Sequence, residues 1–277
     1  MSLTRKGFLK MLGFGALAAG TKAYGLPSKA LEDARAAAKK IKITDVEIYL
    51  FDLPLTSPFR IAIGEMTAAN DLLVRVKTDQ GIVGLGEACP FPPITGETQA
   101  TNAAAAAAIR GMLIGKDPLA IDDLLRLIGP IVHSNPSAVA AFDMALHDIL
   151  GKVAGLPLFR LLGGTKSTFE TDITTGLDTP EAMAAEAKGY ADRGYKTLKV
   201  KVGLDPEDDI VRMTAVRKAI GPDIALRIDA NQGYSVPQAL QALKGMAPLD
   251  IQFCEQPVRA SDTAGLRAVR RQSPISI

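Results

Sequence analysis

Charged side chains stand near the ends of three successive segments that otherwise consist mainly of apolar residues. Lys199 and Lys201 alternate with apolar residues, and Asp229 follows Arg227 at the same two-residue spacing. Residues two apart point to the same face of a β-strand, so each pair shares one face. Glu255 closes the third segment, directly before a Gln-Pro pair. Buried parallel strands are usually continuous apolar runs. A single buried strand with charged residues could be explained by an ion pair in the protein interior. Three successive strands with charged residues at the same end favour a functional site instead.

Together these side chains could remove a proton next to a carboxylate group. Asp229 and Glu255 are hard oxygen ligands of the kind that Mg²⁺ prefers. A Mg²⁺ ion that holds a substrate carboxylate stabilises the enediolate formed when the adjacent α-proton leaves. A lysine can take that proton only as a neutral amine, so its pKa must fall well below the usual value of about 10.4. The adjacent charge of Lys199 beside Lys201, and a nearby metal, would both lower that pKa.

The composition leaves few other chemistries. Lys and Arg number 32 and Asp and Glu 30 among 277 residues, and no basic stripe is present, which argues against nucleic-acid binding. His133 and His147 are the only histidines, so neither a His-rich zinc site nor a Ser-His-Asp mechanism is expected. Cys89 and Cys254 lie far apart without metal or redox spacing, and we expect buried free thiols. Acid/base chemistry must therefore rely on lysines and carboxylates.

Alternating strands and helices are expected to carry the charged residues in a domain over residues 161–277. The strands are predicted over 169–175, 196–202, 224–230 and 250–255, the helices over 180–193, 206–220, 236–246 and 261–271, and residues 274–277 open a fifth strand. Such alternation indicates an α/β class with parallel pairing. It fits an incomplete (β/α)₈ barrel or an open doubly wound sheet. No glycine-rich phosphate loop follows the first strand, which favours the barrel, whose active sites lie at the carboxyl ends of the strands.

Residues 41–160 are expected to form a separate α+β domain. Strands are predicted over 41–53, 71–77 and 82–87, with a hairpin turn at Asp79-Gln80-Gly81 between the last two. Pro54 and Pro58 are expected to break the first strand. Helices are predicted over 98–114, 118–128 and 137–154.

Residues 1–25 are expected to be an export signal. Arg5-Lys6 precedes an apolar run of small residues from Met11 to Gly20. The run is too short for a permanent membrane anchor. It resembles a twin-arginine signal with Lys6 at the second arginine, so we expect export, with a periplasmic location. If the segment is an ordinary amphipathic helix instead, the cytoplasm is expected. Residues 26–40, which are rich in Ala and Lys, are expected to be a helical or loose linker.

The motifs around the charged residues resemble the muconate lactonizing enzyme branch of the enolase superfamily. They are Leu198-Lys-Val-Lys-Val-Gly203, Ile228-Asp-Ala-Asn-Gln-Gly233 and Glu255-Gln-Pro257, and the resemblance covers about residues 41–277. It implies an α+β enolase-like capping domain followed by a (β/α)₈ TIM barrel. It also implies that Lys201 is a general base with Lys199 as its electrostatic partner, and that Asp229 and Glu255 are ligands of a Mg²⁺ cofactor.

Finer features resemble the dipeptide epimerases of that branch, of the L-Ala-D/L-Glu epimerase type. Ser57-Pro-Phe-Arg60 resembles their substrate-covering loop, and Pro93–Glu97 and Glu170–Thr174 resemble two further segments. The resemblance implies that Phe59, Arg60 and Thr174 bind a dipeptide, whose α-carbon is epimerised. Gly64 stands near where Ala-Glu epimerases often carry an arginine, so a neutral or hydrophobic second residue is at least as well supported as an acidic one.

The family pattern also requires groups that would follow residue 277. These are a third metal ligand, a second catalytic lysine and an acidic motif for the dipeptide amino group. The chain is therefore expected to be a C-terminally truncated fragment that is inactive by itself. Two alternatives stay open: a cycloisomerase or o-succinylbenzoate synthase type reaction of the same branch, and a non-catalytic exported small-molecule binder. The sequence leaves the oligomeric state open, a homo-oligomer included.

Overall fold

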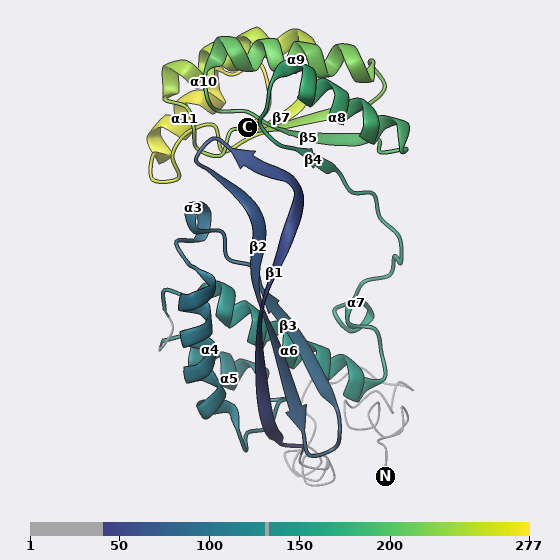
Figure 1. Ribbon diagram of the computed structural model, residues 1–277, viewed down its shortest axis with the longest axis vertical. Helices are drawn as coiled ribbons and strands as arrows, with labels where there is room; N and C mark the ends of the chain where they lie inside the picture. Colours follow the sequence, from purple (N-terminus) through teal and green to yellow (C-terminus); the bar gives the residue numbers. More distant parts are fainter. Residues whose placement is uncertain (1–40, 131–132) are drawn as a thin grey trace, which may run out of the picture. The chain divides into compact units, whose positions relative to one another are not determined.

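Two compact units make up the computed structural model, which describes residues 41–130 and 133–277 (Figure 1). The first unit runs to Leu53 and continues over Asn70–Ser167, and the second comprises Pro54–Ala69 and Thr168–Ile277. Residues 54–69 thus group with the C-terminal unit, whereas the sequence pattern predicts them in the first domain. The predicted export signal and linker lie outside the described residues. Among the residues described, no helix is long and apolar enough to cross a membrane.

The first unit is built on a three-stranded sheet. Its order is β1 (Ile43–Ile61), β2 (Gly64–Thr78) and β3 (Val83–Ala88). β2 and β3 are antiparallel, with Val74 opposite Gly86. The predicted hairpin turn between them is confirmed, because the N–H of Gly81, at φ +73°, donates to the carbonyl of Thr78 at 3.1 Å. The expected strand–turn–strand pattern therefore holds for this half of the sheet.

The prediction that prolines break the first strand is wrong. β1 continues through Pro54 and Pro58 to Ile61, and only two residues separate it from β2. β1 lies at the edge of the sheet, with β2 as its single neighbour. An edge strand tolerates residues that lack an N–H, since that donor would have no partner strand there.

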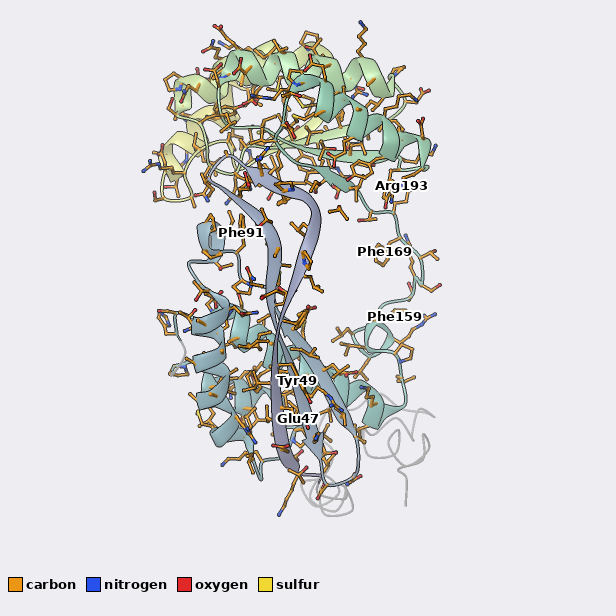
Figure 2. The ribbon with its side chains drawn as sticks, in the orientation of Figure 1. Glu47, Tyr49, Phe91, Phe159, Phe169 and Arg193 are labelled. Carbon is orange, nitrogen blue, oxygen red and sulfur yellow. The ribbon has the colours of Figure 1, made fainter. Side chains whose placement is uncertain are left out.

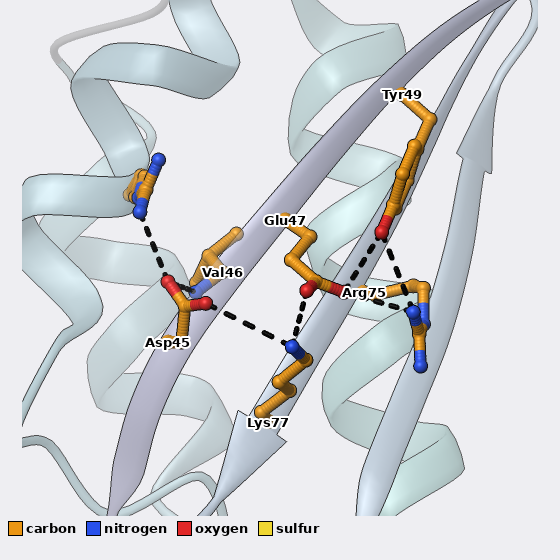
Figure 3. Close-up of polar contacts among 7 residues, drawn as sticks. Asp45, Val46, Glu47, Tyr49, Arg75 and Lys77 are labelled. Atoms are coloured by element: carbon orange, nitrogen blue, oxygen red, sulfur yellow. Dashed lines mark hydrogen bonds and ion pairs between the residues drawn. The ribbon is translucent and has the colours of Figure 1, made fainter.

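A row of charged side chains covers one face of β1 and β2 (Figure 3). Glu47 accepts hydrogen bonds from Lys77, from Arg75 at 2.9 Å and from the hydroxyl of Tyr49 at 3.0 Å. Asp45 accepts from Arg110 at 3.0 Å. The hydrogen bond from Lys77 holds the pKa of Glu47 below its ordinary value. These groups are solvent-accessible, so the row keeps this face of the sheet polar and adds little to stability.

The helices of the first unit are α3 (Pro92–Thr95), α4 (Gln99–Leu113), α5 (Ile121–Ile128), α6 (Pro136–Ala154) and α7 (Leu158–Leu161). Side chains of α4, α5 and α6 share a buried core with β1 and β2, and α7 contacts α6. α6 lies directly on β3, and its buried residues Ala141, Ala145 and Ile149 form the stripe that faces the sheet. A Cβ atom on Gly86 would come within 1.8 Å of the carbonyl oxygen of Ala141. Glycine at this position therefore allows the backbones of α6 and β3 to touch.

Replacing Gly86 by alanine is expected to destabilise the protein by roughly 1–3 kcal/mol, because an overpacked backbone contact can be relieved only by moving α6 away from β3. Urea denaturation would measure the free energy of unfolding. Gly111→Ala is the matched control, since a Cβ there meets nothing within 4 Å and the residue lies in α4, where alanine is the better helix former. Equal stability of the two variants would contradict the close contact.

The two cysteines differ in exposure. Cys254 is buried as predicted, but Cys89 is exposed, so the prediction of two buried thiols is wrong for Cys89. Cys89 follows β3 directly, at a position whose side chain is turned away from the core. Desolvation and the neighbouring carboxylate of Asp71 still raise the pKa of Cys89 to about 11. The exposed thiol is therefore a poor nucleophile at neutral pH.

The second unit contains a four-stranded parallel sheet with strands in chain order. Its strands are β4 (Ile173–Thr175), β5 (Thr197–Lys201), β6 (Ala225–Asp229) and β7 (Ile251–Glu255). Helices α8 (Pro180–Asp192), α9 (Pro206–Ile220), α10 (Val236–Met246) and α11 (Thr263–Gln272) alternate with them and lie on one face of the sheet (Figure 1). Sequential order with all helices on one face is the winding of a (β/α) barrel, whereas a doubly wound sheet reverses its order. The barrel prediction is confirmed.

The ends of this sheet differ slightly from the prediction. β4 begins only at Ile173, and the side chain of Phe169 is 89% exposed (Figure 2). At the other end, Phe253 and Ser276 form a parallel bridge, in which the N–H of Cys254 donates to the carbonyl of Ser276 at 2.8 Å. Residues 274–277 therefore begin to pair beside β7, as expected of a fifth strand.

Candidate active site

The two faces of β5 show how the sheet separates its core from its site. Leu198 and Val200 are completely buried among the helices. Lys199 and Lys201 alternate with them and so point to the opposite face. The same alternation places Leu226 and Ile228 of β6 in the core. The apolar residues thus fix which face of each strand carries the charges.

The strand register brings the charged residues to one end of the sheet. Lys201 lies opposite Asp229, and Asp229 lies opposite Glu255. Thr174 lies opposite Lys199. Parallel strands end at the same edge, so residues from β4 to β7 that are distant in sequence become neighbours.

Both lysines bind the same carboxylate. Nζ of Lys201 and Nζ of Lys199 lie 2.8 Å and 2.9 Å from Oδ2 of Asp229. Lys199 also lies 2.8 Å from Oε2 of Glu255. The side chains of Asp229 and Lys201 are only 2% and 9% exposed, whereas that of Glu255 is 46% exposed. The cluster is therefore buried at Asp229 and opens to solvent at Glu255.

Burial and pairing act in opposite directions on these groups. Burial raises the pKa of Asp229, but hydrogen bonds from Lys201 and Lys199 outweigh it and hold the pKa below the ordinary value. Burial lowers the pKa of Lys199, but its bonds to Glu255 and Asp229 outweigh that and raise the pKa. With the protein groups alone, Lys199 is thus a firmly charged ammonium whose pKa lies above, not below, the ordinary value.

The donor set suits a hard cation. Asp229 and Glu255 already share one cation, the ammonium of Lys199, so their oxygens are close enough to hold a common ion. The side-chain oxygen of Asn231, also buried, has no hydrogen-bond partner. Carboxylate and amide oxygens are the ligands that Mg²⁺ accepts. Within the described residues, no three His, Cys, Asp or Glu side chains gather into a metal-binding group.

The backbone at the strand ends is held in an unusual conformation. Asn231, Gln232 and Gln256 have φ values of 43°, 69° and 40°. Residues other than glycine rarely adopt positive φ, and such strain collects at functional sites. The N–H of Asn231 donates to Oδ1 of Asp229 at 2.9 Å. The turn after β6 thereby fixes the second oxygen of the carboxylate that the lysines bind.

Comparison with known proteins identifies the family. The mandelate racemase/muconate lactonizing enzyme N-terminal domain matches residues 43–163, and the enolase C-terminal domain-like family matches residues 182–277. The L-Ala-D/L-Glu epimerase of Bacillus subtilis is 40% identical over 233 residues, 83% of this chain and 64% of that protein. The L-Lys-D/L-Arg epimerase of Desulforapulum autotrophicum is 37% identical over 84% of this chain and 67% of that protein. This chain belongs to the enolase superfamily.

A solved structure of the same superfamily has the same fold. The dipeptide epimerase of Cytophaga hutchinsonii, crystallised with Mg and the dipeptide D-Ala-L-Val, superposes with a TM-score of 0.82 at 39% identity. The match covers 84% of this chain and 64% of that one. The chain thus spans slightly less than two thirds of the length of the first relatives it matches. The predicted family and fold are confirmed.

Of the residues predicted to bind substrate, Phe59 lies close to Lys201, whereas Arg60 pairs with other residues. The ring of Phe59 lies with its centroid 5.9 Å from Nζ of Lys201. Arg60, by contrast, pairs with Glu65 and lies 3.9 Å from Asp178. The charge of Arg60 is therefore compensated by Glu65, five residues further along the chain, and by Asp178, a distant residue that the sequence alone could not pair with it.

Arg227 also has a structural role that the sequence left open. Its guanidinium donates to Asp172 and to Gln252, each at 2.9 Å, and lies 5.4 Å from the ring centroid of Phe253. Arg227 is two residues before Asp229 and thus one layer deeper on the same face. Arg227 therefore forms a partly exposed ion pair, with side chains 34% and 27% exposed, whereas its neighbours at the strand end form the candidate site.

Proposed function

We propose that the whole protein is a Mg²⁺-dependent epimerase that inverts the α-carbon of a dipeptide. The observation that carries this proposal is the cluster in which Lys201 and Lys199 bind Asp229 beside Glu255. A base and a pair of hard oxygen ligands at one strand edge are the groups that α-proton abstraction beside a carboxylate requires. Relatives named as dipeptide epimerases, at 39–40% identity, support the choice of substrate class.

Each residue then has a distinct task. Asp229 and Glu255 would hold Mg²⁺, which when bound supplies positive charge beside the substrate carboxylate. Lys201, the more buried lysine, would take or return the α-proton as a neutral amine. Lys199 would keep positive charge beside it, which favours that neutral form. Phe59 would cover the amine of Lys201 and exclude water from it.

The substrate we propose has a neutral or hydrophobic second residue. A cavity of about 710 Å³ borders Arg60, Gly64 and Glu65, and its wall also includes Leu177 and Leu204. Arg60 is the cation of the predicted substrate-covering segment Ser57–Arg60, and Glu65 and Asp178 already compensate its charge. Arg212, the other cation of this wall, pairs with Asp209 and lies 3.9 Å from Asp208, so an acidic second residue would meet no uncompensated positive charge there. A relative from Enterococcus faecalis, 39% identical, is named a hydrophobic dipeptide epimerase.

Solvent-deuterium exchange tests both parts of the proposal. The whole protein with Mg²⁺ would be incubated in D₂O with dipeptides whose second residue is acidic, neutral or hydrophobic. We expect deuterium at the α-carbon, with neutral or hydrophobic dipeptides preferred, and no exchange after chelation of the metal. Exchange fastest with Ala-Glu would contradict the substrate preference. Exchange on no dipeptide would contradict the epimerase itself and favour the cycloisomerase or binder alternatives.

We further propose that residues 1–25 direct export. Arg5-Lys6 and the short apolar run from Met11 to Gly20 support this proposal. Fusing the first 30 residues to a reporter is expected to move it to the periplasm, and replacing Arg5 and Lys6 by glutamine should abolish the transfer. Retention of the unmodified fusion in the cytoplasm would contradict the proposal.

A further inference from the structure

A buried carboxylate lies beneath the candidate site without belonging to it. Asp209, in the first turn of α9, is completely buried, whereas the side chain of its neighbour Asp208 is 70% exposed. A buried charge is costly unless it is fully hydrogen-bonded. Three acidic residues, Glu207, Asp208 and Asp209, stand in the first turn of α9. Acidic side chains there are usually exposed to solvent and interact favourably with the helix dipole. The burial of Asp209 therefore requires a separate explanation.

Its hydrogen bonds join two loops. Oδ2 of Asp209 accepts from the backbone N–H groups of Gly203 and Leu204 at 2.8 Å and 3.1 Å, in the loop after β5. The same oxygen accepts from the hydroxyl of Tyr234 at 2.6 Å, in the loop after β6. Oδ1 accepts from Arg212 at 2.9 Å, which balances the charge. One carboxylate thus ties together the segments that follow Lys201 and Asp229 in the chain.

Tyr234 links these two loops to a third loop, the one that follows β7. Its ring is 3% exposed, and its N–H donates to the carbonyl of Pro257, in the loop after β7, at 3.2 Å. Burial, with the adjacent Asp209, raises the pKa of Tyr234 far above its ordinary value. The hydroxyl therefore stays protonated at neutral pH and donates to Asp209.

The two loops are packed backbone against backbone. A Cβ on Gly233 would come within 2.0 Å of the carbonyl oxygen of Gly203, and a Cβ on Gly203 within 2.3 Å of that of Ala230. Both would also approach Cβ of Ala62, at 2.7 Å and 2.9 Å. The N–H of Val202 donates to the carbonyl of Asp229 at 3.0 Å. A shift of either loop would therefore move the ends of β5 and β6 that hold Lys201 and Asp229.

We propose that Asp209 is a positioning residue: through Gly203 and Tyr234 it fixes the two loops that keep Lys201 against Asp229. This inference rests on the proposed function for its catalytic consequence. It predicts that loosening Asp209 slows the proton transfer, since a misplacement of about 1 Å can cost up to roughly 10²-fold in rate. The KM for the substrate, which depends on the predicted substrate-covering segment Ser57–Arg60, should change much less.

The test compares three variants in the whole protein: Tyr234→Phe, which removes only the hydroxyl, Asp209→Asn, and the control Asp223→Asn, which makes the same charge change at an exposed residue outside both loops. For Tyr234→Phe we expect amide hydrogen exchange in the loops over residues 202–204 and 231–234 to rise roughly tenfold, the effect of one lost hydrogen bond. We expect kcat to fall roughly tenfold with KM within about threefold. Asp209→Asn should do the same, and Asp223→Asn should change neither.

The two readouts separate the possible failures. Unchanged hydrogen exchange in Tyr234→Phe and Asp209→Asn would overturn the positioning role, whatever the activity. Faster exchange with unchanged kcat would overturn its link to Lys201 and Asp229. If the unmodified protein exchanges no dipeptide proton, the proposed function fails, and hydrogen exchange alone still decides whether Asp209 holds the loops.

Discussion

Replacing Lys201 by alanine is expected to reduce α-proton exchange by roughly 10²–10⁴-fold, the usual contribution of a general base. Asp229 would keep its bonds from Lys199 and from the N–H of Asn231, so the variant should still fold. The rate of deuterium uptake by a dipeptide measures the effect. A large loss of exchange without a loss of secondary structure would assign the proton transfer to this amine.

Lys188→Ala is the matched control for that experiment. Lys188 is an exposed lysine of α8 whose ammonium pairs with Asp192 at 2.9 Å. Exposed pairs of this kind contribute little, so activity should be unchanged. If Lys201→Ala retained exchange within about threefold of the unmodified protein, another group would have to be the base.

Replacing Asp229 by asparagine is expected to have the largest effect on stability, about 3 kcal/mol in the absence of metal. The change leaves Lys201 buried without a counter-charge, and breaking a buried ion pair on one side typically costs roughly 3–5 kcal/mol. Lys199 keeps Glu255, which places the loss at the lower end. Mg²⁺ binding should also be lost. Urea denaturation and calorimetric titration would measure the two effects, with the exposed Asp192→Asn as the control.

The same pair gives this prediction a pH dependence. The pKa of Asp229 is lowered from 3.8, so its contribution to stability is present above pH 3.8 and is lost as the pH falls through the folded-state pKa. The pKa of Lys199 is raised from 10.5, so its contribution is present below pH 10.5 and is lost as the pH rises through the folded-state pKa. The difference between the unmodified protein and Asp229→Asn should therefore be greatest between these values. A difference that stays constant down to pH 2 would contradict the pairing.

The second unit was predictable because local signals and the global fold agree. The predicted helices over 206–220 and 236–246 coincide with α9 and α10, since each begins with a proline in its first turn after a capping residue, Asp205 or Ser235. The alternation of Leu198 and Val200 with Lys199 and Lys201 identifies both the core face and the charged face of β5. Parallel pairing of successive strands then brings Asp229 and Glu255 to the lysines.

What the sequence did not predict depends on contacts between distant segments. Pro54 and Pro58 read as strand breakers because nothing local shows that β1 is an edge strand. Asp209 reads as a solvated acid because its partners, Gly203 and Tyr234, come from two other loops. The compensation of Arg60 by Asp178 likewise joins segments more than one hundred residues apart in the chain. Such residues can be assigned only once the packing is known.

In the proposed mechanism, Lys201 faces a metal and a substrate held by Asp229 and Glu255. A crystal structure of the whole protein with Mg²⁺ and a dipeptide tests it most directly. We predict carboxylate oxygens of Asp229 and Glu255 at about 2.1 Å from the ion and Nζ of Lys201 facing the α-carbon of the dipeptide. An ion bound elsewhere, with Lys201 still paired to Asp229 and no dipeptide beside it, would contradict the claim.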